Sequence, residues 1–145
     1  MAKLGSKAGW SGNYCHKLTA AVSLSPGDSG KVFFLDTATG YTVTLPSIAD
    51  AEAGFNCKFI VKTAPSSGTY VITEKTSADT NVIITNGINE NEVDTDDDGP
   101  YNAAHTTITF ADGVAVAGDY VELLCDGTNW YATGQTNADG GITLA

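Results

Sequence analysis

The sequence predicts an all-β fold, a small antiparallel β-sandwich or barrel with at most one short helix. The chain has 145 residues, and its 16 glycines and four prolines separate many short apolar stretches. Within these stretches apolar and polar side chains alternate, and a period of two residues is typical of strands with one buried face. The length suits one domain with its own core. A sandwich or barrel is the natural closure, because it buries that face of every strand.

Residues 1–25 are predicted to form a flexible, extended N-terminal arm. Glycines interrupt this segment and it shows no sustained period, although residues 18–24 have the composition of a first strand. Trp10 and Tyr14 are large aromatic side chains, which supply much contact area for little lost conformational entropy. We expect them to contact a partner surface. The alternative is that the arm folds back and Trp10 covers its own domain.

Residues 26–135 are predicted to form the β domain. Its clearest alternation is at residues 41–45, where apolar side chains share one face and threonines the other. A helical turn is expected only at residues 47–54, which Ser47 can cap. Asp126-Gly127 suits the tip of a hairpin, because glycine adopts the positive φ of a tight turn. The expected strands cover residues 31–35, 41–45, 55–63, 70–73, 82–85, 106–110, 119–125 and 130–135.

Residues 136–145 are predicted to form a C-terminal tail. The segment is polar and rich in glycine until it ends in Ile142-Thr143-Leu144-Ala145. We expect it either to be loose or to add a strand to a neighbouring molecule.

The charge balance argues against nucleic acids and membranes as partners. Seven residues are basic, all of them lysine, and 17 are acidic, so the formal net charge is −10. Nucleic-acid binding needs many cations to displace counterions from phosphates, and arginine is the usual reader of guanine edges. Anionic membranes attract the same basic clusters. The apolar runs are also far shorter than the roughly 20 residues that cross a bilayer, and no signal peptide is recognisable, so we expect synthesis in a cytoplasm.

One segment is strongly acidic. Six of the nine residues at positions 90–98 carry a carboxylate, and Asp94, Asp96 and Asp98 precede a glycine as in the opening of a calcium-binding loop. The twelfth position of that loop, where calcium requires a glutamate, is His105 here, and no flanking helices are predicted. We therefore favour a solvated acidic loop and expect no cofactor. Calcium bound by these three aspartates is the alternative.

The cysteines do not form a recognisable framework. Cys15, Cys57 and Cys125 are an odd number without a CxxC pair, which favours reduced thiols packed as small apolar side chains. A nucleophilic pair of Cys57 or Cys125 with His105 would make the chain a small cysteine hydrolase. Nothing in the sequence marks such a pair, so we expect no enzymatic activity.

The segment Gly118-Asp119-Tyr120-Val121-Glu122-Leu123-Leu124-Cys125-Asp126-Gly127-Thr128-Asn129-Trp130 carries a resemblance. It is similar to the G-D-x-V-x-L-x-x-D-G-x-x-W hairpin of tailed-bacteriophage surface proteins, which include capsid decoration proteins, head fibres and tail-fibre modules. Upstream, the order of residues 33–36, the Tyr-Thr-Val-Thr-Leu-Pro strand at 41–46 and residues 59–61 resembles the same domains. The resemblance covers about residues 26–135.

The resemblance implies a viral structural protein of the capsid decoration, or cement, class. Such a protein is most often a homotrimer that binds the major capsid protein on the outside of the virion and holds neighbouring capsomers together. Trp10 and Tyr14 would then be candidate capsid contacts. An alternative is a receptor- or carbohydrate-binding module of a head or tail fibre, with Tyr70 and Tyr101 as candidate exposed aromatics. The cysteine hydrolase is the second alternative.

Overall fold

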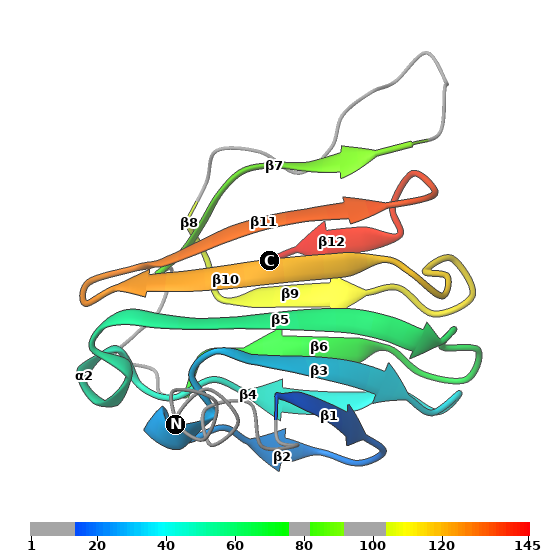
Figure 1. The fold of residues 1–145 in the computed structure, drawn as a ribbon. Helices are drawn as coiled ribbons and strands as arrows, with labels where there is room; N and C mark the ends of the chain where they lie inside the picture. The colour runs from blue at the N-terminus through cyan, green and yellow to red at the C-terminus, as the bar shows by residue number, and fades with distance from the viewer. Residues whose placement is uncertain (1–13, 76–81, 92–103) are drawn as a thin grey trace, which may run out of the picture.

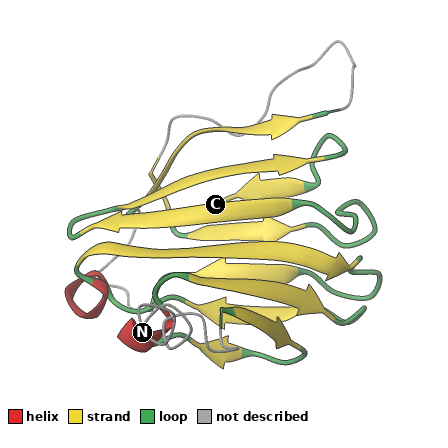
Figure 2. Cartoon of the chain, viewed as in Figure 1, coloured by secondary structure: helices red, strands yellow, loops and turns green. Residues whose placement is uncertain are grey.

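The computed structural model describes residues 14–75, 82–91 and 104–145, and these form two β-sheets packed face to face (Figure 1). The predicted all-β sandwich is confirmed, and Figure 2 shows strands nearly throughout. The large sheet has the strand order β1 (Cys15–Leu18), β3 (Lys31–Asp36), β5 (Ala53–Thr63), β10 (Tyr120–Asp126), β11 (Trp130–Thr136), β7 (Ile83–Glu90) and β8 (Ala104–His105). The small sheet has the order β12 (Ile142–Leu144), β9 (Thr107–Phe110), β6 (Tyr70–Thr73), β4 (Tyr41–Thr44) and β2 (Val22–Ser23).

Both sheets are mixed, which corrects the expectation of a purely antiparallel sandwich. In the described part of the chain β1, β3 and β5 are parallel neighbours in the large sheet, and β2, β4 and β6 are parallel neighbours in the small one. The cause is the path of the chain, which crosses from one sheet to the other after each of these strands. Consecutive strands therefore lie in opposite layers, and strands of the same layer run the same way. Alternation alone does not reveal this, because it shows which face is buried but not which strand is the neighbour.

Both chain ends are more deeply integrated than the sequence suggested. The predicted arm contains β1 and β2, so the sandwich includes residues from Cys15 onward. The predicted tail contains β12, which pairs antiparallel with β9 of its own chain rather than with a neighbouring molecule. The backbone N–H groups of Thr106 and Thr107 also donate to the Ala145 carbonyl, over 2.6 and 2.8 Å. Residues 15–18, 22–23 and 142–144 are thus strands of the sandwich.

The core lies between the sheets and is filled by the inward side chain of each strand. Trp130 is buried and meets Phe55 edge-on, with ring centroids 5.4 Å apart. Phe33 and Phe59 stack side by side on the parallel strands β3 and β5. Side chains of this size each contribute roughly 1.5–3 kcal/mol when they leave water, so the apolar alternation is what holds the layers together.

In the described residues, the turns and the one short α-helix follow their sequence signals. α2 (Ile48–Ala51) begins after Ser47, whose hydroxyl accepts from the Asp50 backbone N–H at 3.2 Å, and η1 (Pro26–Asp28) is a 3-10 turn. In the β10–β11 hairpin Gly127 has φ +90°, and the Asp126 carboxylate accepts two backbone N–H groups at 2.7 Å each. Among the described residues no helix has the length and apolar character to cross a membrane.

Candidate docking surface

The two outer faces of the sandwich differ in chemistry, and this difference defines the candidate site. On the small sheet the outward positions carry mostly hydroxyl groups. They are Ser23, Thr42, Thr44, Val71, Thr73, Thr107, Thr109 and Thr143, as the strand registers and burial pattern show. Threonine combines high β propensity with a hydrated side chain, so this face is fully explained as a solvent-facing surface.

The outer face of the large sheet is apolar, aromatic and lysine-rich instead. Its outward positions include Cys15, Lys17, Val32, Phe34, Lys58, Ile60, Lys62, Tyr120, Glu122, Leu124, Tyr131 and Thr133. Leu124 is 50% exposed and Tyr131 43% exposed, and Tyr14, immediately before β1, is 52% exposed. Of these, tyrosine is enriched where proteins contact one another.

Local sequence forces these side chains outward. In β10 Val121, Leu123 and Cys125 fill the core, so Leu124 must point to the opposite face. In β11 Trp130 is buried and Tyr131 therefore points out. The signal available in the sequence was a pair of consecutive apolar residues, since a strand with one buried face can bury only one member of each pair.

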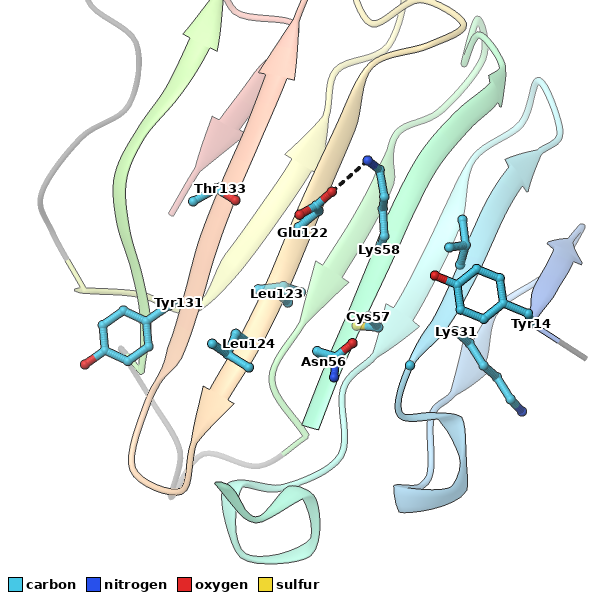
Figure 3. Close-up of a pocket in the computed structure, with 12 residues that line it drawn as sticks. Tyr14, Lys31, Asn56, Cys57, Lys58, Glu122, Leu123, Leu124, Tyr131 and Thr133 are labelled. Carbon is cyan, nitrogen blue, oxygen red and sulfur yellow. Dashed lines mark hydrogen bonds and ion pairs between the residues drawn. The ribbon is translucent and has the colours of Figure 1, made fainter. Parts of the chain in front are cut away.

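A groove of about 470 Å³ crosses β3, β5, β10 and β11 on this face (Figure 3). We call it the tyrosine groove. Tyr14 and Tyr131 stand at its two ends, Leu124 and Asn56 lie between them, and Thr133 completes the lining on β11. The hydrogen bond to the Asp126 carboxylate raises the pKa of Tyr131.

One side of the tyrosine groove is charged. Lys58 Nζ lies 2.7 Å from Glu122 Oε1 and 4.0 Å from the centroid of the Tyr120 ring. Both side chains of this ion pair are partly exposed, so the pair adds little to stability. The pair and the ring contact hold Lys58 across the outer face of the large sheet.

A second hollow, of about 530 Å³, lies farther along β3 and β5. We call it the lysine hollow. Phe34, Ile60 and Cys15 form its apolar part, and Lys17 and Lys62 stand at its rim. Both ammonium groups share one carboxylate, that of Asp36, at 3.5 and 2.6 Å. The hydrogen bond from Lys62, with a further one from the Thr63 hydroxyl, lowers the pKa of Asp36 to about 2.

Only part of the predicted site set lies within the described residues. Tyr14 does, and it is exposed at the tyrosine groove. Trp10, the aspartates Asp94, Asp96 and Asp98, and Tyr101 lie outside the described residues. Among residues 14–75, 82–91 and 104–145, no cluster of three or more potential metal ligands is present.

Tyr70 is not the exposed aromatic that carbohydrate recognition would need. Its side chain is fully buried on β6, and its hydroxyl accepts from the Thr37 N–H at 2.8 Å. The exposed aromatics of the described residues on this side are Tyr14 and Tyr131, which sequence reasoning assigned to the arm and to an ordinary strand.

The structure separates the candidate cysteines from His105. Cys57 is buried on β5, four strand places from β8, and Cys125 on β10 is three places away. At about 4.8 Å per strand these separations are roughly 19 and 14 Å, far beyond hydrogen-bond reach. Burial also raises the pKa of the Cys57 thiol, whereas a nucleophile needs a lowered one. Neither pair has the geometry of a nucleophile and its base.

Comparison with known proteins found no family model, no curated protein and no solved structure that matches this chain.

Proposed function

We propose that this chain is a viral structural protein, a capsid decoration protein that docks on the major capsid protein through the outer face of its large sheet. The observation that supports it is the contrast between the two outer faces. One is covered with threonine, and the other carries Tyr14, Leu124 and Tyr131 around one groove. Scattered apolar residues on a surface need no explanation, but a group of them on one side indicates a contact.

The mechanism is adhesion by burial. Each of the three exposed side chains contributes roughly 1 kcal/mol when its exposed half leaves water. This is weak for one molecule, and it becomes effective when several linked copies bind neighbouring capsomers together. Lys58 would meet acidic groups on the shell and orient the contact. A protein that binds two capsomers at once holds them together without any chemical reaction.

The test is binding to undecorated, expanded capsids of the virus that carries the gene. We expect wild-type protein to co-sediment with these capsids and to appear as ordered density on their outer surface by cryo-electron microscopy. Leu124→Asp places a charge at the centre of the groove and should abolish binding. Thr109→Asp, the matched change in a strand of the opposite face, should leave binding intact. Absence of wild-type binding, or equal binding by both variants, would refute the proposal.

One observation favours a second candidate function, carbohydrate binding. Tyr14 and Tyr131 stand at the two ends of an open groove with an amide, Asn56, and a hydroxyl, Thr133, between them. Aromatic rings stack on the apolar faces of sugars, and amides and hydroxyls bind their hydroxyl groups. Calorimetric titration with bacterial surface polysaccharide separates the two functions: saturable heat that Tyr131→Ala removes supports sugar binding, and no heat excludes it for that polysaccharide.

A further inference from the structure

The loop between β9 and β10, residues 111–119, exposes apolar surface that the tyrosine groove does not use. Val114 and Val116 are each 37% exposed, while Ala115 between them is buried. The groove accounts for Tyr14, Leu124 and Tyr131, and these two valines complete the set of exposed large apolar side chains in the described residues. They lie beyond the groove, so they call for a different contact.

Hydrogen bonds hold this loop in one shape. The Gly113 N–H donates to the Pro65 carbonyl at 2.9 Å, and the Gly118 N–H donates to the Val61 carbonyl at 2.8 Å. The buried Asp119 carboxylate accepts from the Val116 N–H at 2.9 Å. Two valines presented on a fixed loop lose little conformational entropy on binding, which favours association.

The loop adjoins the lysine hollow without filling it. Ala117 and Gly118, at the end of the loop, line the hollow, whereas Val114 and Val116 do not. A molecule thus carries an apolar projection and an apolar recess side by side at one end of the sandwich. The recess has a volume of about 530 Å³ and is open to solvent.

The charges of loop and hollow are complementary. Copies of a chain with net charge −10 repel one another except where lysines gather. At the rim of the hollow Lys17 and Lys62 share the single carboxylate of Asp36, so one positive charge is not balanced there. Asp112 is exposed on the loop, two residues before Val114. A second copy that brings its valines into the hollow therefore also brings a carboxylate to the lysines.

We infer that copies of this chain associate by inserting Val114 and Val116 of one copy into the lysine hollow of the next, with Asp112 beside Lys17. The contact joins two different patches, and such a contact closes into a ring when the rotation between copies allows it. Loop and hollow lie at the same end of the sandwich, and none of the residues that line the hollow lines the tyrosine groove. The inference extends the proposed function, since linked copies supply multivalent docking, but its test needs no capsid.

Sedimentation equilibrium of the purified full chain provides the test. We expect wild-type protein to form a defined closed oligomer at about 100 µM or below, and Val114→Ser/Val116→Ser to weaken association by roughly threefold to tenfold per valine. Val71→Ser, on the threonine face, should not change association. Leu124→Asp should also leave the oligomer intact while abolishing capsid binding, so failure of self-association and failure of docking are distinguishable. A monomeric wild-type protein at that concentration would overturn the inference.

A charge exchange and a thiol provide independent readouts. Lys17→Glu and Asp112→Lys should each weaken association. In the double variant, at least half of the association free energy lost in the weaker single variant should be recovered. Cys15 lines the hollow and is the one exposed cysteine of the three. Its alkylation should therefore slow several-fold in the oligomer and not in the valine variant. Absence of recovery in the double variant, or equal alkylation rates in both proteins, would contradict the assigned contact.

Discussion

Tyr70→Phe removes one oxygen atom from the core and should cost more stability than its size suggests. Tyr70 is fully buried on β6, and its hydroxyl lies where the ends of β3 and β5 come together. It accepts from the Thr37 N–H at 2.8 Å, and its proton is shared between the carbonyls of Thr37 and Thr63, the latter at 2.9 Å. Phenylalanine keeps the ring and its packing, so the change isolates the hydrogen bonds.

The expected cost follows from the groups left behind. Each buried polar group that loses its partner costs about 1–3 kcal/mol. The substitution leaves one N–H donor and at least one carbonyl without this partner, and both belong to half-buried residues that water can reach in part. We therefore expect a loss of about 2–3 kcal/mol in the free energy of unfolding.

Equilibrium unfolding in urea measures this loss, and the chain offers a matched control. The Tyr41 hydroxyl donates a single hydrogen bond, to the Leu18 carbonyl at 2.7 Å, from a half-buried ring. Tyr41→Phe should cost about 1 kcal/mol, close to the net value of one hydrogen bond. If Tyr70→Phe costs no more than Tyr41→Phe, the hydroxyl of Tyr70 does not join the strand ends and the reasoning is refuted.

Two further predictions concern acid stability and backbone packing. The pKa of Asp36 is lowered from 3.8 to about 2, so its ion pairs stabilise the fold above about pH 4 and this contribution is lost as the pH falls toward 2. Thermal melts should therefore show a smaller decrease in melting temperature between pH 5 and pH 2 for Asp36→Asn than for wild type. Equal decreases would contradict this prediction. A Cβ at Gly134 would lie 2.4 Å from the Tyr120 carbonyl oxygen, so Gly134→Ala should cost about 2 kcal/mol or more in urea unfolding. Gly27→Ala, whose Cβ meets nothing closer than 3.8 Å, should cost less than about 0.5 kcal/mol, and similar costs for the two would show that the strand yields easily.

The buried face of the strands was predictable, because it depends on a local period. Tyr41-Thr42-Val43-Thr44-Leu45 identifies its inward side without any tertiary information, and the structure buries Val43 and Leu45 completely. The Asp126-Gly127 turn was predictable for the same reason, since its conformation is set by the residues that form it.

Strand partners were not predictable, because nothing local encodes them. β3 and β5 are parallel neighbours although β4 lies between them in the chain and belongs to the other sheet. The strands at the two chain ends could not be predicted for a related reason. Cys15–Leu18 and Ile142–Leu144 are too short to show a period, and they become strands because β3 and β9 offer edges to pair with.

The candidate surface combines both kinds of information. Consecutive apolar pairs such as Leu123-Leu124 and Trp130-Tyr131 show in the sequence that one member of each pair must leave the core. The hairpin at Asp126-Gly127 places Leu124 and Tyr131 opposite one another on β10 and β11, whereas only the sheet order places Lys58 of β5 beside them. Their exposed halves add nothing to the burial that stabilises the fold, while the threonine face shows that this architecture accommodates polar residues at equivalent positions. A contact outside the chain is therefore the simplest physical reason for this face, and single substitutions on it should alter association far more than unfolding.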